Sequence, residues 1–274
     1  MFSIFKKKKI IPHIKLNGVI GNVGKFKQGI DFAGQEEIIK KAFSLKKSPA
    51  VAISINSPGG SPVQSHLIHD YVKQLAKKHK KKVIIFAEDV AASGGYFIAC
   101  SGDEIYANSS SIIGSIGVIS QFVDLSKLLK SAKINPYIIK AGTYKDLGQP
   151  TRSLTREEKT IMKRLLKNVH KQFVDDILRT RKEKIKGNIW DYAQGQVFSG
   201  QEAKKYGLVD ELAGLWDAGR QIHKELGIKS PFGLKFIKKK KKLSLMQIVE
   251  GFDDVTKGMA SNFFSQAVPM FLYK

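Results

Sequence analysis

Apolar and polar positions follow two different patterns along the chain, one that predicts strands and one that predicts helices. A continuous run of apolar, β-branched residues, as in Lys82 to Ala87, predicts a buried strand. Apolar residues that recur every four positions, as in Ile161, Leu165 and Val169, predict a helix. The order of the segments predicts a βαβ-type α/β domain. The expected strands or extended segments are 10–20, 50–55, 82–87, 104–107 and 135–140, and the expected helices are 29–43, 61–80, 124–132, 155–184, 199–207 and 215–226.

Three helix starts can be placed from their capping residues. Thr155 and Ser199 are each followed three positions later by glutamate, which is the pattern of a capping box. Asp124 is expected to cap the helix that runs to Ala132. The segment 143–150 is expected to be a loop.

The charge pattern sets the expected domain limits. Residues 1–9 carry the run Lys6 to Lys9 and are expected to form a flexible basic tail. Residues 10–228 form the expected α/β domain. Residues 229–274 hold a lysine run and then an apolar segment with helical spacing, which we expect to contact a neighbouring subunit or a membrane surface. No internal repeat at a solenoid period is present.

Composition excludes several classes of protein. The chain has 274 residues and a net charge of +23, but its lysines are scattered and no aromatic–basic nucleic-acid motif appears, so no specific nucleic-acid partner is expected. The single cysteine, Cys100, rules out an intramolecular disulfide and is expected to face the core. No apolar stretch is long enough for a transmembrane helix, and residues 1–9 have the wrong order for a signal peptide.

The most informative stretch is V-A-A-S-G-G-Y-F-I-A-C, residues 90–100, directly after a predicted buried strand. It reads as a strand, a tight turn with Ser93 at the bend, and a helix. Gly94 and Gly95 let the backbone turn sharply and expose their N–H groups at a helix N-terminus. A serine hydroxyl beside free amide donors suits acyl-transfer chemistry. The alternative is that Ser93 only caps a helix.

Two further motifs lie at the ends of predicted strands. Ser57-Pro-Gly-Gly60 can supply backbone amides, so Gly60 and Gly94 could together polarise a carbonyl group, an effect worth on the order of 3 kcal/mol per donor. The alternative is an ordinary glycine turn, with Ser57 as a turn residue. Ala141-Gly-Thr-Tyr-Lys145-Asp146 places a lysine in a loop of small residues, where a lysine is usually only solvated.

The histidines suggest no competing site. His66 and His69 stand three residues apart on one predicted helix, but no third metal ligand is placed by the sequence, so no metal is expected. The other histidines have no obvious partner in the sequence. They are His13, His79, His170 and His223.

Taken in order, S-P-G-G, A-A-S-G-G-Y, G-S-I-G-V, K-A-G-T-Y-K-D and Q-V-F-S-G-Q-E-A-K-K-Y-G-L-V-D-E-L resemble the signal peptide peptidase A family of serine peptidases over about residues 12–220. The resemblance implies a crotonase/Clp-protease-like fold and a Ser/Lys dyad. Ser93 matches the nucleophile and Lys145 the general base, while Gly94 and the Gly59/Gly60 pair match the oxyanion hole. The implied cleft residues are Ser115 and Gly117 of the G-S-I-G-V motif.

The resemblance also implies a substrate and an assembly. The substrates are hydrophobic peptides such as remnant signal peptides, bound in extended form along a strand edge, for which 114–120 is a candidate. The assembly is a homo-oligomeric ring of four or eight active sites, and no cofactor is expected. Many members carry an N-terminal membrane anchor, and none is expected in this sequence. A cytoplasmic location is expected, with the basic segments as solvated tails; the alternative is that residues 6–9 or 238–242 hold the protein at an anionic membrane surface.

Two other classes of function remain open at the level of sequence. A crotonase-fold acyl-thioester enzyme also uses backbone amides around an oxyanion, but it needs neither a nucleophilic Ser93 nor Lys145. A non-catalytic binding scaffold would leave both side chains exposed and widely separated. If Lys145 is the base it must be neutral, so its pKa must lie well below the ordinary value of about 10.4.

Overall fold

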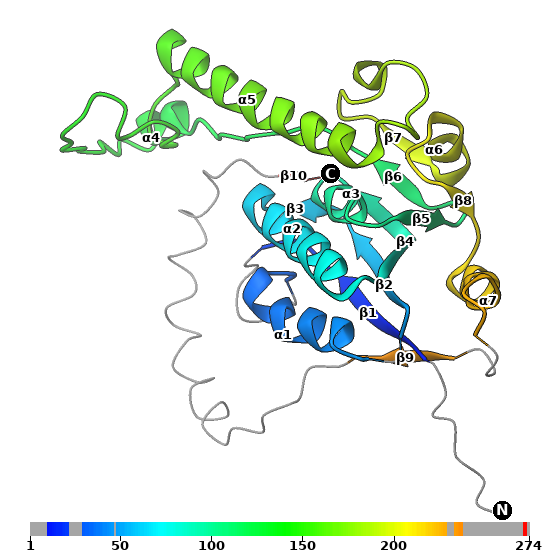
Figure 1. Cartoon of the computed structure of the whole chain (residues 1–274). Coiled ribbons are helices and arrows are strands. Elements are labelled where there is room, and N and C mark those ends of the chain that lie inside the picture. The colour runs from blue at the N-terminus through cyan, green and yellow to red at the C-terminus, as the bar shows by residue number, and fades with distance from the viewer. Residues whose placement is uncertain (1–9, 22–28, 47, 229–232, 238–270, 273–274) are drawn as a thin grey trace, which may run out of the picture. The chain divides into compact units, whose positions relative to one another are not determined.

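The computed structural model describes residues 10–21, 29–46, 48–228, 233–237 and 271–272 (Figure 1). The chain divides into two compact units. The first holds residues 1–117, 172–240 and 271–274, and the second holds residues 118–171 and 241–270. Each unit is described by itself below.

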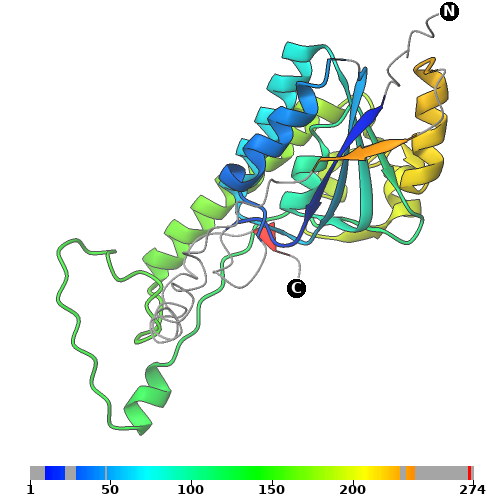
Figure 2. The same ribbon diagram turned by 90° about the horizontal axis from the view of Figure 1, so that it is seen from below.

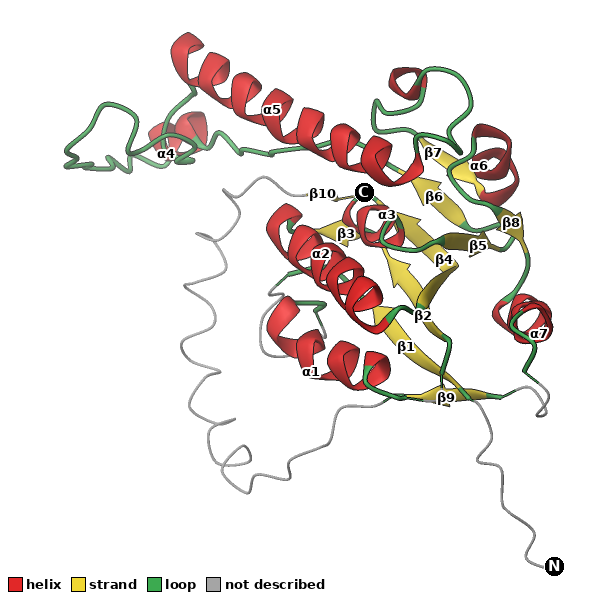
Figure 3. Ribbon diagram, viewed as in Figure 1, coloured by secondary structure: helices red, strands yellow, loops and turns green. Residues whose placement is uncertain are grey.

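The first unit is built on a largely parallel sheet in the order β7-β6-β4-β2-β1-β9. Strand β5 pairs with β4 on the same side as β6, and β8 continues from β5. Strand β7 is antiparallel to β6. Figure 3 shows the strands in yellow. Their bounds are β1 (Ile11–Asn17), β2 (Ala50–Ser57), β4 (Lys82–Ala92), β5 (Glu104–Ala107), β6 (Ile112–Gly114), β7 (Val197–Ser199), β8 (Glu211–Leu212) and β9 (Leu234–Phe236).

Helices cover both faces of this sheet (Figures 1 and 2). Helices α1 (Phe32–Phe43) and α2 (Pro62–His79) connect successive parallel strands and lie side by side on one face, as βαβ crossovers require. Helix α7 (Leu215–Glu225) packs on the opposite face. The shorter helices are α3 (Gly94–Ala99), the 3₁₀ turn η1 (Ile189–Asp191) and α6 (Gly200–Tyr206).

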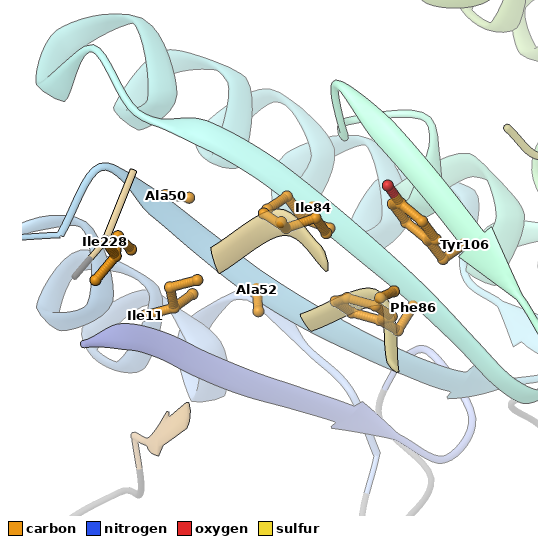
Figure 4. Packing of buried hydrophobic residues seen from close by; sticks show 9 residues of the cluster. Ile11, Ala50, Ala52, Ile84, Phe86, Tyr106 and Ile228 are labelled. Atoms are coloured by element: carbon orange, nitrogen blue, oxygen red, sulfur yellow. The ribbon is translucent and has the colours of Figure 1, made fainter. Parts of the chain in front are cut away.

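The core between the sheet and α7 is formed by alternate residues of neighbouring strands (Figure 4). Because successive side chains of a strand point to opposite faces, Ala50 and Ala52 face α7 while Val51 and Ile53 face α1 and α2. All four side chains are fully buried. The cluster facing α7 consists of Ile11, Ala50, Ala52, Ile84, Phe86, Tyr106, Ala218, Ile222 and Ile228.

Strand β4 is the central strand, and it is longer than its apolar run predicts. Its first half pairs with β5 and its last residues, Val90 to Ala92, pair with β6. The polar residues Glu88 and Asp89 interrupt the apolar pattern, but the backbone continues as a strand because both ladders hold it. The strand therefore leads directly to Ser93.

A second, two-stranded pairing lies beside the main sheet. The glycines of S-P-G-G form β3 (Gly59–Gly60), and β10 (Phe271–Leu272) pairs with it in antiparallel register. The following helix α2 starts one residue later, with Ser61 as its N-cap.

Helix α5 (Arg156–Arg181) begins in the second unit and ends in the first. The capping box that precedes it is confirmed, since the Thr155 N–H donates to Glu158 and the Glu158 N–H donates to Thr155. The capping box of Ser199 and Glu202 at α6 is confirmed as well.

The second unit differs from two expectations. The strand expected at 135–140 is wrong: these residues are exposed and belong to no sheet in the described structure, because a short apolar run such as Tyr137 to Ile139 forms a strand only where a partner strand pairs with it. The N-cap of α4 (Ser126–Ser131) is Leu125 rather than Asp124. Asp124 still accepts a hydrogen bond from the Ser126 N–H, at 2.9 Å.

Within the described residues, no helix combines the length and the apolar character needed to cross a bilayer. The basic tail 1–9, the lysine run 238–242 and the apolar segment 243–270 lie outside the described residues, and the expectations placed on them stay predictions.

Candidate active site

Ser93 lies in a strained strand-to-helix turn between β4 and α3. Its backbone has φ +53° and ψ −123°, a conformation that side-chain-bearing residues adopt at a cost of order 1–3 kcal/mol. The Ser93 N–H donates to the Gly114 carbonyl at 2.7 Å, and the Ser93 carbonyl accepts from the Phe97 N–H at 2.9 Å. Both ends of the turn are thus fixed. This is the kind of bend by which nucleophilic serines are held at the end of a strand.

The Ser93 hydroxyl is not used by the fold. It makes no capping hydrogen bond to α3, so the alternative in which Ser93 only caps a helix is wrong. The side chain is 1% exposed in the single chain, and its oxygen has no hydrogen-bond partner among the described residues. A buried hydroxyl without a partner costs free energy. The Ser101 hydroxyl is in the same state, and Ser93 differs from it by its strained bend and by the neighbouring Gly94 and Gly60.

Gly94, which directly follows Ser93, lies close to Gly60. A Cβ atom built on Gly94 would stand 3.5 Å from the Gly60 nitrogen. Gly94 is the first residue of α3, and first-turn N–H groups of a helix have no acceptor within the helix. The structure therefore brings together the two glycines expected to form an oxyanion hole.

Gly59, the third glycine expected there, has both its N–H and its carbonyl in hydrogen bonds to nearby residues. Its N–H donates to the Ser57 hydroxyl oxygen at 3.2 Å, and its carbonyl accepts from the Ile20 N–H at 2.8 Å. Ser57 is thus the last residue of β2 rather than a turn residue, although its hydroxyl holds the turn that follows. Gly59 sets the path of β3, which leaves Gly60 as the donor nearer to Gly94.

Ser115 and Gly117 follow β6, next to the residue that holds Ser93. Ser115 has φ +49° and is buried, and its N–H donates to the Gln196 carbonyl at 2.6 Å. The Ile116 carbonyl accepts from the Gly195 N–H at 3.0 Å. One edge of the first part of the tract 114–120 is therefore paired with 195–196, and a peptide bound along this tract would have to use the other edge.

Lys145 lies in the second unit, within a series of turns from 142 to 149. Its N–H donates to the Gly142 carbonyl at 3.2 Å, and its side chain is exposed in the single chain. The neighbouring carboxylate, Asp146, is buried and is bound by Lys140 and by Arg152. Ser93, in contrast, belongs to the first unit.

The histidines pair with neighbours instead of forming a metal site. His66 lies 3.0 Å from Asp70 and 3.5 Å from Asp176, and His69 lies 2.9 Å from Asp70. Across the described residues, no three histidine, cysteine or acidic side chains are grouped to hold a metal ion. His13 does have a partner: its Nε2 lies 2.7 Å from the Ser54 hydroxyl, with both side chains buried in the sheet.

Cys100 is buried as expected, and burial raises the pKa of its thiol to about 12.

Two residues that contact candidate site residues or their neighbours could not be identified from the sequence pattern. Ser65 of α2 packs under Gly94, and Arg152 binds Asp146. The four-residue spacing between Ser61 and Ser65 places both on one face of α2, but nothing in it indicates that this face meets Gly94.

Comparison with known proteins agrees with this geometry. The family model "Peptidase family S49" matches residues 75–229, more than half of the chain, and the model "Clp protease" matches residues 25–114. The second match fits the parallel α/β sheet of the first unit, so the expected crotonase/Clp-like fold is confirmed.

Individual relatives cover different shares of the chain. "Putative protease slr0021" of Synechocystis is 36% identical over 217 residues, 77% of this chain and 72% of that protein. "Putative signal peptide peptidase SppA" of Enterococcus faecium is 28% identical over 267 residues, 95% of this chain and 72% of that protein. "Na(+)/H(+) antiporter NhaA" of Brucella abortus is 41% identical over 220 residues, 80% of this chain.

The chain spans only 29% of the length of the Brucella protein, so the activity in that name is not carried over. The S49 match covers Ser93 and Lys145 alike, and the protease-named relatives cover most of the chain. The chain belongs to peptidase family S49, the family of SppA-type peptidases.

Proposed function

We propose that this protein is a serine endopeptidase in which Ser93 is the nucleophile and Lys145 the general base. The observation that carries the proposal is the state of Ser93: a strained bend presents a hydroxyl that neither caps a helix nor bonds to another described residue. Gly94 directly follows this serine, and the Gly60 nitrogen lies close to Gly94. A fold gains no stability from such an arrangement, whereas acyl transfer needs it.

The proposed reaction runs in two halves. The Ser93 oxygen attacks the peptide carbonyl carbon while a neutral Lys145 amine takes the hydroxyl proton, and the N–H groups of Gly94 and Gly60 stabilise the oxyanion. The C–N bond then breaks, and Lys145 returns the proton to the leaving amine. In the second half a water molecule gives its proton to Lys145 and attacks the acyl carbon, which releases the product acid and restores the Ser93 hydroxyl.

The proposed substrate is a hydrophobic peptide in extended form, such as a remnant signal peptide. Support comes from β3, where the backbone of Phe271 and Leu272 pairs with Gly60 and Gly59 as an antiparallel strand. The glycine strand next to the proposed oxyanion hole can therefore accept an extended segment through main-chain hydrogen bonds. Pairing of this kind recognises an extended backbone and depends little on the identity of the side chains.

A homo-oligomer is the proposed assembly, with a ring of four or eight active sites as the family resemblance implies. Large apolar side chains of the second unit are exposed to solvent in the single chain: Tyr137 is 92% exposed and Ile139 is fully exposed. Exposed apolar residues gathered on one short segment are typical of an interface between subunits. Association would also allow Ser93 of one copy to meet Lys145 of another.

The deciding experiment is labelling with a serine-acylating phosphonate probe. The wild-type chain should be modified at Ser93, and Ser93→Ala should be neither labelled nor active on a hydrophobic peptide library. Lys145→Met should lower the labelling rate by at least 100-fold. Ser101→Ala removes another buried serine hydroxyl and serves as the control. A crotonase-type acyl-thioester enzyme would remain unlabelled, and full peptidase activity in Lys145→Met would overturn the role of Lys145.

A further inference from the structure

A cluster of four charged side chains surrounds the turn that carries Lys145. The Arg152 Nε donates to Asp146 at 2.8 Å, and its two terminal nitrogens donate to Glu158 at 2.8 and 2.6 Å. Lys140 donates to Asp146 from the other side. Arg152 thus bridges two carboxylates, of which one is the direct neighbour of Lys145.

Both carboxylates are buried, so they depend on these partners. Asp146 is 6% exposed and Glu158 is 1% exposed, while Lys140 and Arg152 remain about one-third exposed. Hydrogen bonds from Arg152 lower the pKa of Glu158 to about 2, and those from Arg152 and Lys140 hold the pKa of Asp146 well below its ordinary value. Two cations and two anions therefore balance at neutral pH, which is the condition for keeping ionised carboxylates away from water.

The cluster ties the turn to a rigid element. Glu158 also accepts from the Thr155 N–H at 2.9 Å, and this pair forms the capping box at the start of α5. A continuous path of hydrogen bonds thus runs from the first turn of a 26-residue helix through Arg152 to Asp146. The backbone of Lys145 is one peptide bond away from the end of this path.

The turn itself offers little other support. Within the described residues 142–149 the backbone hydrogen bonds are local. The N–H groups of Lys145, Leu147 and Gln149 donate to the carbonyls of Gly142, Tyr144 and Asp146, at 3.1 to 3.2 Å. Lys140 adds a bond from its Nζ to the Thr143 carbonyl at 2.9 Å. Lys140 therefore binds residues on both sides of Lys145, and Arg152 holds the far side to α5.

We propose that Arg152 is a positioning residue for the catalytic lysine: by binding Asp146 and Glu158 together, it fixes the backbone of Lys145 relative to α5. This inference rests on the proposed role of Lys145 as general base. It explains why a buried carboxylate stands next to a lysine that must lose its proton: the negative charge of Asp146 is taken up by Arg152 and Lys140. A displacement of about 1 Å at a reacting group can cost about 100-fold in rate.

The test compares Arg152→Lys and Asp146→Asn with the wild-type full-length chain. Arg152→Lys keeps the charge but cannot bridge two carboxylates in the geometry of a guanidinium. Asp146→Asn keeps the side-chain volume. The groups that lose a charged partner are Lys140 and Arg152, and both are partly exposed to solvent, so this variant should fold even if the first does not. Both should lower kcat on a hydrophobic peptide by 10- to 100-fold and leave KM within about twofold.

A role in folding alone would give a different result in probe labelling. If Arg152 positions Lys145, Ser93 should be labelled to full stoichiometry but 10- to 100-fold more slowly. If Arg152 only stabilises the fold, the labelled fraction should fall and the rate of the remaining fraction should be that of the wild type. Arg156→Lys changes an exposed arginine on the first turn of α5 and should have no effect. Glu158→Gln leaves the Arg152–Asp146 bond in place but weakens the link from Arg152 to α5, so it should lower kcat as well.

The outcomes separate this inference from the proposed function. If Lys145→Met is inactive while Arg152→Lys and Asp146→Asn keep kcat within twofold of the wild type, the positioning role is overturned and the Ser/Lys mechanism stands. If Lys145→Met is fully active, the mechanism itself fails. A fall in labelled fraction without a change in rate also overturns the positioning role.

Discussion

The hydroxyl oxygen of Ser65 occupies the space next to Gly94 that any side chain there would need. A Cβ atom on Gly94 would come closer to this oxygen than real Cβ atoms come to any neighbour, and it would stand 3.2 Å from Ile20 Cδ1. Ser65 is fully buried and is fixed by donating to the Ser61 carbonyl at 2.9 Å. The first turn of α2 therefore packs directly against the proposed oxyanion hole.

Gly94→Ala should remove activity because the new methyl group must push α3 away from α2. We expect kcat to fall by at least 100-fold, the size of effect seen when one oxyanion donor is lost. The double variant Gly94→Ala/Ser65→Ala relieves the closest contact and should regain part of that loss. Peptidase assays of the single and double variants check this, with Gly214→Ala as control, since a Cβ there meets no atom within 4 Å. Equal activity of the two variants would contradict the contact with Ser65.

Ser93→Gly should be more stable than Ser93→Ala although both are inactive. Alanine keeps a side chain at φ +53°, whereas glycine adopts this region without the steric cost. We expect a difference of about 1 kcal/mol in the free energy of unfolding, in favour of glycine. Urea denaturation of the two variants measures it. Equal stability would mean that the bend at residue 93 carries no strain.

His13 should make the protein less stable in mild acid. Burial, with a smaller effect from Lys15, lowers the pKa of His13 to about 4, against 6.5 in the unfolded chain. Between pH 6.5 and pH 4 the unfolded state therefore binds a proton that the folded state does not, so the stability contribution present above pH 6.5 is lost as the pH falls. The loss should be about 2 to 3 kcal/mol, at 1.36 kcal/mol per pH unit. Denaturation curves at pH 7 and pH 4 should show a smaller decrease for His13→Gln than for the wild type.

Ile139→Glu should weaken the proposed assembly without unfolding the chain. Ile139 is fully exposed in the single chain, so a charge there costs nothing within the subunit but must be desolvated in an apolar interface. Light scattering should show a lower mass than for the wild type at the same concentration. Asn135→Glu, an exposed polar position on the same segment, is the control. A monomeric wild-type chain would contradict the proposed homo-oligomer.

The elements that could be predicted from sequence are those whose signal is local. The apolar run before Ser93 identifies β4, the paired Thr155 and Glu158 identify the start of α5, and two glycines after Ser93 identify a tight turn. Each of these depends on residues within a few positions of one another. The order of five motifs along the chain indicates the family, and the family resemblance in turn implies the fold.

What could not be predicted depends on contacts between distant segments. Residues 135–140 contain the β-favouring run Tyr137 to Ile139, but no other segment pairs with them in the described structure. The extension of β4 beyond Ala87 depends on β6, twenty residues away along the chain. His13 meets Ser54 only because β1 and β2 pair in parallel, 41 residues apart. Arg152 shows no pattern that would distinguish it from the other basic residues of a lysine-rich chain.

The anchoring of Ser93 at the end of the central strand has a consequence for the working enzyme. A strained serine in a free loop could relax by a small rotation whenever no substrate is bound. Here such a rotation would break the bond from the Ser93 N–H to Gly114 and disturb the β4–β6 ladder at 90–92, where Ala91, Ala92 and Ile113 are fully buried. The strain at this bend therefore persists whether or not a substrate is bound, and under the proposed mechanism each catalytic cycle would start from a serine that is already oriented for attack.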